Sequence, residues 1–299
     1  MRPEIRLPAL DSASEKPALK QAAFAPGTTE ATRRDAALAE SAGLNASATP
    51  RSRWLDGWLM RFAPVKARRA RCINALAPGV LPLDEKLARA VQAYAEAGLP
   101  LMLRITPFTE AGGSGRAESL DGGEILDRAL DERGWRAFDF TRVLLARIDD
   151  ERLAAAAARR PAAVTLRPVG AEAFAEAVGA LRGSPADQRA GQAERLRESP
   201  VPFRAALLER DGELLACAQT AREGDWVGLY DVVTAPQARN SGLATVLCAT
   251  VLAEAASAGA RRAYLQVGAD NAPALAVYRR LGFADAYGYH YRSADPAAE

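Results

Sequence analysis

The second half of the chain alternates short apolar segments, typical of strands, with longer segments whose apolar positions recur at helical spacing. The Asp211-Gly212 pair between two of these strands predicts a hairpin, and Gly282 predicts the end of the last helix. The order β-α-α-β-β-β-α-β-α-β describes an α/β fold with a sheet of mixed direction. The predicted strands cover 164–168, 203–209, 213–221, 226–234, 263–267 and 284–291, and the predicted helices cover 171–181, 186–198, 243–258 and 273–281.

The first half shows a weaker version of the same pattern. A helix, Ala97-Gly98, a strand, a helix and Gly134-Trp135 parallel a helix, Ala258-Gly259, a strand, a helix and Gly282-Phe283 in the second half. This internal repeat predicts two copies of one fold side by side. The predicted strands of this half cover 54–62, 99–106 and 138–148, the predicted helices cover 33–42, 84–96 and 125–132, and a Gly/Ser-rich loop is predicted at 110–123.

The charged, Ala-rich segment 149–161 ends at a proline and predicts a linker or a connecting helix between the two halves. Residues 1–34 mix Pro, Gly, Ser, Thr and charges without periodicity, which predicts a flexible N-terminal extension. The expected organisation is therefore an extension at 1–34, a first domain at 35–150, a linker at 151–162 and a second domain at 163–299.

Composition excludes several classes of function. The chain has 299 residues and a formal net charge of +2, which argues against a nucleic-acid binder. Its three cysteines form no C-x-x-C pair, and His290 is its only histidine, so a disulfide framework, a His-rich metal site and a Ser-His-Asp triad are excluded. No apolar run approaches about 18 residues. We expect no metal and no membrane partner, and a cytoplasmic location; the Arg-rich, Ala-rich composition is bacterial-like.

The stretch 232–244, VVTAPQARNSGLA, follows a predicted strand and opens a helix, a geometry suited to an anion. Gly242 and the small Ala244 leave room for phosphate oxygens beside backbone amides, and Arg239 adds a positive charge. The fingerprints GxxxxGK[ST] and GxGxxG are absent here, which removes the P-loop and Rossmann interpretations. Taken alone, the stretch also fits an ordinary strand-to-helix turn.

The downstream sequence adds a second motif. Residues 239–244, RNSGLA, match the pattern R/Q-x-x-G-x-G/A, and 271–283, NAPALAVYRRLGF, follow the strand that ends in LQV. With both motifs, residues 164–292 resemble the GCN5-related N-acetyltransferase (GNAT) superfamily. The resemblance implies an α/β fold of two acyl-CoA N-acyltransferase-like domains, each a mixed sheet flanked by helices. It also implies acetyl-CoA as co-substrate and a small-molecule or peptide amine as acceptor.

By this resemblance, the backbone of 232–234 pairs with the pantetheine amides, and Asn271 touches the pantetheine or its phosphate end. Tyr278 lies near the thioester sulfur and is the candidate acid; the alternative is a tyrosine packed on a helix face. The residues implied to bind the cofactor are Val232, Val233, Thr234, Arg239, Asn240, Ser241, Gly242, Leu243, Ala244, Thr245, Asn271 and Tyr278.

A general base is harder to assign. Asp231, Glu223 and Asp225 lie on or beside the predicted central strand, where an amine would arrive, and Asp231 is the candidate catalytic carboxylate. Each also fits a solvated carboxylate, and water alone could carry the proton away. We expect a surface or packing role for His290. Cys217 and Cys248 fall at positions that look buried, which argues against an acyl-cysteine route.

The first half lacks the phosphate-binding pattern. At the equivalent place, 77–86 carries two prolines and opens its helix with Asp84 and Glu85, which would repel a phosphate. The whole chain therefore resembles a tandem acetyltransferase with a degenerate first domain, which we expect to wall the acceptor cleft. The basic run 66–71 fits a solvated surface better than an acidic acceptor.

The leading hypothesis is an acetyl-CoA-dependent N-acetyltransferase in which the amine attacks directly within a ternary complex. The first alternative is a non-catalytic acyl-CoA-binding regulatory module. The second is an O- or S-acyltransferase on the same fold. The residues determine neither the acceptor nor the oligomeric state.

Overall fold

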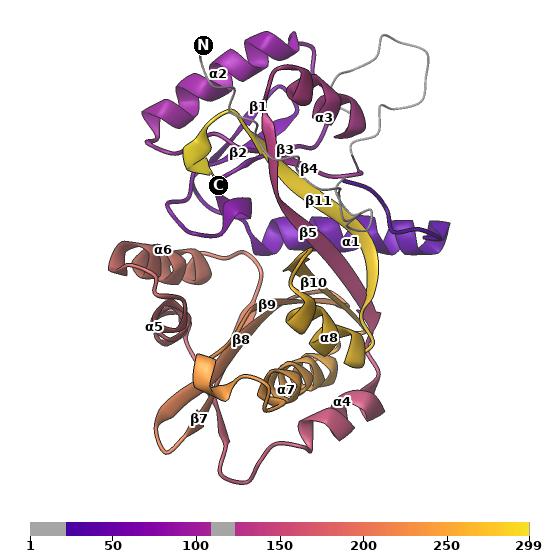
Figure 1. The fold of residues 1–299 in the computed structure, drawn as a ribbon, viewed down its shortest axis with the longest axis vertical. Helices are drawn as coiled ribbons and strands as arrows, with labels where there is room; N and C mark the ends of the chain where they lie inside the picture. The colour runs from indigo at the N-terminus through magenta and orange to yellow at the C-terminus, as the bar shows by residue number, and fades with distance from the viewer. Residues whose placement is uncertain (1–21, 109–122, 299) are drawn as a thin grey trace, which may run out of the picture.

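One mixed sheet of eleven strands runs the length of the described chain in the computed structural model (Figure 1). The model describes residues 22–108 and 123–298, so most of the predicted extension and of the predicted 110–123 loop lies outside the described residues. The strand order is β1-β2-β3-β4-β11-β5-β10-β9-β8-β7-β6. Helices cover the sheet, as expected for an α/β fold.

The strands are β1 (Ser52–Leu55), β2 (Trp58–Arg61), β3 (Ile73–Ala75), β4 (Leu103–Ile105), β5 (Arg136–Arg147), β6 (Thr165–Val169), β7 (Phe203–Arg210), β8 (Glu213–Glu223), β9 (Trp226–Thr234), β10 (Arg262–Gly268) and β11 (Ala284–Ser293). The α-helices are α1 (Glu30–Ala46), α2 (Leu83–Glu96), α3 (Gly123–Glu132), α4 (Asp150–Ala157), α5 (Ala171–Arg182), α6 (Ala186–Arg197), α7 (Leu243–Ser257) and α8 (Ala272–Arg280). Short 3₁₀ turns are η1 (Arg68–Ala70), η2 (Pro236–Ala238) and η3 (Pro296–Ala298).

The two halves exchange their last strands. β5 belongs to the first half but lies between β10 and β11, and it pairs antiparallel with β10 from Thr141 to Arg147. β11 ends the second half but lies between β4 and β5, where His290 is in register with Ile105. Figure 1 shows these two long strands side by side through the middle of the molecule. The two sheets expected from the repeat are therefore one continuous sheet.

Helix α1 lies across the junction of the two halves (Figure 1). Its Ala39 and Ala42 pack with Trp226 and Tyr264 of the second half. Its buried Glu40 accepts hydrogen bonds from Arg104 of β4 and from Tyr287 of β11. The helix starts earlier than the predicted 33–42 segment because the Thr29 side chain caps it, accepting a 3.2 Å hydrogen bond from Thr32 N. It also runs through Gly43, where the sequence predicted its end, to Ala46.

The segment 54–62, predicted as one strand, is a hairpin of β1 and β2. Asp56 and Gly57 form its turn with φ of 44° and 84°, a left-handed pair that Asp-Gly adopts readily. A side chain at Gly57 would also lie 2.2 Å from the carbonyl oxygen of Ala77. An Asp-Gly pair also predicted the hairpin of the second half. In 54–62 the alternating large apolar residues around the pair favoured a single continuous strand.

Helix α7 forms the centre of the second half. It is apolar on nearly every side, packs on β8 and β9, and is covered by α4. The predicted boundary segment therefore carries a helix that closes the core of the second half. This packing holds the N-terminus of α7 beside the carboxyl end of β9, where the predicted cofactor residues lie.

Candidate functional site

Strands β9 and β10 separate part of the way along the sheet. Their parallel register starts at Trp226 with Arg262 and ends at Leu229 with Leu265. Beyond that point β9 bulges, because the register with β8 shifts between Gln219 and Cys217. Asp231 occupies the bulge with φ of 49°, a left-handed conformation that Asp tolerates. The edge of β9 that follows the bulge has no registered partner on its β10 side in the described chain.

A cavity of about 750 Å³ lies along this edge, between β9, the N-terminus of α7 and α8. It is lined by all the predicted cofactor residues except Ser241, whose hydroxyl donates a hydrogen bond to the carbonyl oxygen of Ala238. Its lining residues are Val232, Val233, Thr234, Ala238, Arg239, Asn240, Gly242, Leu243, Ala244, Thr245, Asn271, Pro273, Ala274, Ala276, Val277, Tyr278 and Arg280. We call this cavity the nucleotide groove.

The start of α7 offers the groove a set of backbone donors. The helix begins after Gly242, and Val246 N makes the first bond back to Gly242 O at 3.2 Å. The N–H groups of residues 243–245 precede it and point out of the helix end. Gly242 has φ of 79°, and a Cβ there would meet nothing within 4 Å, so the groove is open directly beside these donors. This is the geometry of an anion site.

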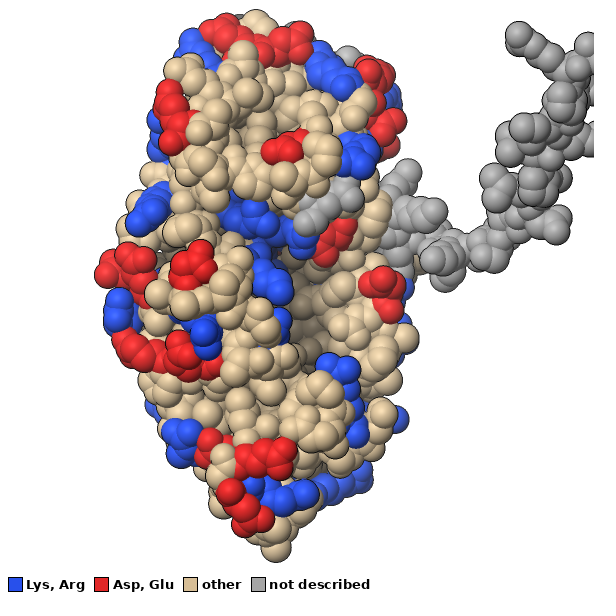
Figure 2. Space-filling view, turned by 60° about the vertical axis from the view of Figure 1, so that its left-hand side comes forward, with Lys and Arg blue, Asp and Glu red and all other residues tan. Residues whose placement is uncertain are grey.

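A second cavity, of about 370 Å³, meets the first. The two share Val232, Asn271, Ala274 and Tyr278. The rest of the second cavity is lined by residues of both halves, including the first-half segment 66–70. Figure 2 shows a hollow on this face with Lys and Arg side chains along its upper border. We call this cavity the central cavity.

Tyr278 lies where the two cavities join and is 8% exposed. Its ring packs edge-on against Phe283, with centroids 6.1 Å apart. No hydrogen bond connects its hydroxyl to another residue of the described chain. Burial raises the pKa of the Tyr278 phenol well above its ordinary value, so the hydroxyl stays protonated and free to donate.

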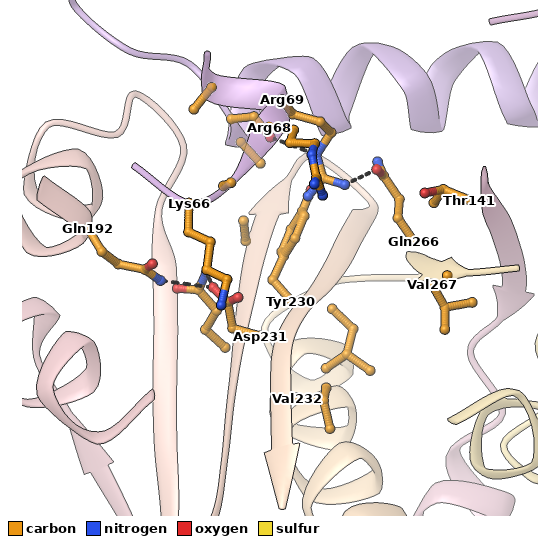
Figure 3. A pocket seen from close by; sticks show the side chains of 18 of the residues that line it. Lys66, Arg68, Arg69, Thr141, Gln192, Tyr230, Asp231, Val232, Gln266 and Val267 are labelled. Carbon is orange, nitrogen blue, oxygen red and sulfur yellow. Dashed lines mark hydrogen bonds between the residues drawn. The ribbon is translucent and has the colours of Figure 1, made fainter. Parts of the chain in front are cut away.

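The carboxylate of Asp231 is held by three side chains. Arg182 Nη1 lies 2.6 Å from Oδ1, and the amides of Gln192 and Gln219 donate to Oδ2 at 2.9 and 3.0 Å (Figure 3). Burial alone would raise the pKa of Asp231, but the charges of Arg182 and Arg195 hold it below its ordinary range. A carboxylate with a low pKa and occupied lone pairs is a weak proton acceptor.

Glu223 and Asp225 lie at the opposite end of β9 and line neither cavity. Glu223 accepts hydrogen bonds from Asn45, and Asp225 lies 3.7 Å from Arg262. Asp231 lies six positions further along the extended chain than Asp225, a span of about 20 Å. Both residues are close to β9 in the sequence, but the extended strand carries them away from the two cavities. The structure therefore removes both from the set of candidate bases.

The basic run 66–71 does not form a solvated surface throughout, contrary to the interpretation favoured from sequence. The turn η1 directs Arg69 inward, where it hydrogen-bonds Gln266 and, at 3.2 Å, the Tyr289 hydroxyl. Its guanidinium also lies 5.6 Å from the ring centre of Tyr230. Figure 3 shows Arg69 directed into the central cavity from above.

The partners of Asp231 and Arg69 were not predicted. Arg182, Gln192 and Gln219 come from α5, α6 and β8, and only the packing of these elements brings them together. Nothing in their local sequence distinguishes them from other polar residues.

The remaining candidates have structural roles. His290 is buried in β11, and its Nε2 lies 2.7 Å from Asp127 of α3, which agrees with packing. Burial raises the pKa of the Cys217 and Cys248 thiols to about 12, so both are unreactive at neutral pH.

The first half carries an acidic residue at the place where it would need to bind phosphate. This residue is Asp84 at the start of α2, which pairs with Arg133 at 2.9 Å. That this half binds no cofactor stays a prediction.

Within residues 22–108 and 123–298, no helix is long and apolar enough to cross a membrane. The same residues contain no group of three His, Cys, Asp or Glu side chains arranged to hold a metal ion.

Comparison with known proteins identifies the second half. Residues 171–283 match the model of the acetyltransferase (GNAT) family. The mycothiol acetyltransferase of Cellulomonas flavigena is 36% identical over 129 residues, which cover 40% of this chain and 36% of that protein. The matched stretch is thus about a third of the relative's length.

Solved structures resemble the chain over more of its length. A GCN5-related N-acetyltransferase from Kribbella flavida is 20% identical with a TM-score of 0.55, and the match covers 89% of this chain and 96% of that one. A tandem GNAT protein from the clavulanic acid biosynthesis pathway is 19% identical with a TM-score of 0.53, covering 71% and 70%. At these identities the likeness shows the fold.

The strand order, the separated β9 and β10, and the groove at the start of α7 define a protein of the acyl-CoA N-acyltransferase fold, with the layout of a tandem GNAT. The part of the chain that carries the groove, residues 171–283, is the part that matches the acetyltransferase (GNAT) family model.

Proposed function

We propose that the protein is an N-acetyltransferase that transfers the acetyl group of acetyl-CoA directly to an amine within a ternary complex. The observation that carries the proposal is the meeting of the two cavities at Tyr278. A nucleotide tail fits the groove, an acceptor fits the central cavity, and the thioester would lie at their junction.

The residues of the groove fit coenzyme A. The unpaired edge of 232–234 is suited to amide groups of an extended pantetheine arm, as an added strand would be. The donors of 243–245 and the guanidinium of Arg239 are suited to the pyrophosphate. Asn271 accepts a 3.2 Å hydrogen bond from Ala274 N, which caps α8 and fixes this side of the junction.

Acetyl-CoA supplies an activated acyl carbon when bound. The amine nitrogen attacks this carbon, the N–C bond forms and the C–S bond breaks. A reference phenol pKa of about 10 against about 8.5 for a thiol makes full proton transfer to the thiolate unfavourable by about 2 kcal/mol. Burial raises the pKa of Tyr278 further, so its role is to donate a hydrogen bond to the sulfur as negative charge develops there.

Asp231 is proposed to position side chains rather than to take the proton. Its carboxylate oxygens accept hydrogen bonds from Arg182, Gln192 and Gln219. Asp139, the other carboxylate of the central cavity, pairs with Arg68 at 2.8 Å. Since both carboxylates are paired, the amine attacks in its neutral form. The proton that its nitrogen loses as the amide forms goes to water, and the sulfur leaves as a thiolate hydrogen-bonded by Tyr278.

Replacing Tyr278 with Phe is expected to lower kcat by about 10–100-fold, because a hydrogen bond made to the leaving sulfur is lost. Coenzyme A affinity should stay within about twofold. Release of the thiol from acetyl-CoA with a panel of amines measures kcat, and calorimetry measures affinity.

The matched control for this variant is Tyr94→Phe. Tyr94 is also buried, but its hydroxyl donates to Arg61 O at 2.9 Å in the core of the first half, so its loss should affect stability and not turnover. Unchanged turnover in Tyr278→Phe would remove Tyr278 from the mechanism. Coenzyme A binding without thiol release for any amine would instead favour a non-catalytic binding module, and release with alcohols or thiols alone would favour an O- or S-acyltransferase.

The pH dependence of kcat/KM should follow the acceptor alone. Activity is expected to rise as the acceptor ammonium deprotonates, near pH 8 for an α-amine. Tyr278 acts in its protonated form, and a raised pKa keeps that form populated to higher pH, so no falling limb should occur below about pH 10. A falling limb between pH 9 and 10 that disappears in Tyr278→Phe would contradict this assignment.

A further inference from the structure

We propose that the acceptor carries an anionic group, a carboxylate or a phosphate, and that Lys66 and Arg195 bind it in the central cavity. This inference rests on the proposed function, because it assigns the chemistry of the acceptor to the cavity that meets the nucleotide groove at Tyr278.

The central cavity is strongly positive. Among residues 22–108 and 123–298, its lining has five cationic side chains and only two carboxylates, those of Asp139 and Asp231, an excess of three positive charges. The whole chain carries a formal net charge of only +2. Positive charge is therefore concentrated in this cavity, while acidic and basic side chains nearly cancel over the rest of the chain. The cationic side chains are Lys66, Arg68, Arg69, Arg182 and Arg195.

Three of the five cations already have fixed partners. Arg68 pairs with Asp139 at 2.8 Å, and Arg182 pairs with Asp231 at 2.6 Å. Arg69 donates to neutral oxygens, including the hydroxyl of Ser47 at 3.3 Å, which fixes its position and leaves its charge uncompensated. Of these three cations, only Arg69 therefore adds positive charge that no carboxylate pairs with.

The other two cations are available to a ligand. The ammonium of Lys66 has no partner among the described residues, and Figure 3 shows this side chain extending into the cavity toward Asp231. Arg195 donates from Nη1 to Ala46 O at 3.2 Å, while its Nε is buried without a hydrogen-bond partner. Burial lowers the pKa of Arg195, the charge of Asp231 opposes this in part, and the charge of Arg69 lowers it further. A bound anion would therefore relieve an unfavourable environment.

The central cavity can hold an acceptor that reaches both the groove and the two available cations. Tyr278 and Asn271 come from the second half and mark the end shared with the groove, whereas Lys66 comes from the first half. A cavity of about 370 Å³ is within the range that encloses a small molecule. An acceptor that spans it presents its amine to the groove and its anionic group to the cations.

The test compares amines with and without an anionic group, using the full chain and acetyl-CoA, and each kcat/KM is expressed per neutral amine so that differences in amine pKa cancel. One pair is an L-amino acid and its amide, and the other is glucosamine 6-phosphate and glucosamine. The anionic member of at least one pair is expected to have a kcat/KM about tenfold higher or more. The pair that shows the larger ratio distinguishes carboxylate from phosphate. In Lys66→Met this ratio should fall toward one, whereas Arg160→Met, which removes an exposed cation after α4, should preserve it.

Equal use of both members, or an undiminished ratio in Lys66→Met, would overturn the inference. If no amine is acetylated, the proposed function fails, and anion binding is then measured directly. Phosphate and succinate, added with coenzyme A at saturation, should raise the Tm of the unmodified chain and of Arg160→Met more than that of Lys66→Met. Equal shifts in all three proteins would overturn the anion site independently of catalysis.

Discussion

Replacing Gly242 with Asp is expected to weaken coenzyme A binding about 100-fold, or about 2.7 kcal/mol. The new carboxylate would lie beside the donors of 243–245, where it both repels a pyrophosphate and competes for its hydrogen bonds. Gly242 has φ of 79°, a conformation that Asp adopts at small cost, so the protein should remain folded. Calorimetry with coenzyme A measures the loss.

Two further variants separate charge from backbone strain. Gly98→Asp places the same residue at φ of 64° with no atom within 4 Å, at the end of α2 and far from the groove, so it should retain full affinity. Gly242→Ala introduces strain without charge and should lose less affinity than Gly242→Asp. Unchanged binding in Gly242→Asp would contradict the anion site at α7 and with it the proposed function.

The isolated second half, residues 149–299, is expected not to fold. Without β5, strands β10 and β11 have no strand between them, and the apolar side chains that pack on Val143 and Leu144 become exposed. The backbone groups of both neighbouring strands would also lose their partners. The measurement is thermal unfolding followed by circular dichroism, in which the fragment should show no cooperative transition.

Supplying the missing strand on a second chain provides the control. Residues 1–148 produced together with 149–299 should form a complex that unfolds cooperatively and binds coenzyme A, since β5 and β11 can then pair as in the intact chain. A cooperative transition of 149–299 alone would show that the exchange of strands is dispensable. The role of the first half in the acceptor cavity is then better tested by point changes such as Lys66→Met than by deletion.

Local patterns were sufficient for most elements of the second half. Helices α5, α6 and α8 and the hairpin at Asp211-Gly212 lie where periodicity and turn chemistry predict them. The predicted cofactor residues other than Ser241 line one groove, because they fall in short stretches at the end of β9, at the start of α7 and on α8. Their binding roles stay predictions that the Gly242 and Tyr278 variants test.

Local patterns do not predict which strands pair when they are far apart in the chain. The apolar pattern of 138–148 predicts a strand but says nothing of its neighbours, and β5 pairs with β10 and β11, more than 100 residues further along the chain. Arg69 belongs to a charged run that resembles a solvated surface, and only the packing of η1 beside β10 and β11 turns it inward.

The sequence by itself determined the mixed α/β class, the glycine-containing bend before α7 and the position of Tyr278 after it, because these depend on contacts between residues close in the chain. The tertiary structure alone decided that the halves share one sheet, that three side chains hold the Asp231 carboxylate and that five cations line the central cavity. The physical reason is that charge compensation and burial depend on which distant elements pack together. The same local pattern of charged residues is compatible with a solvated surface and with a binding cavity.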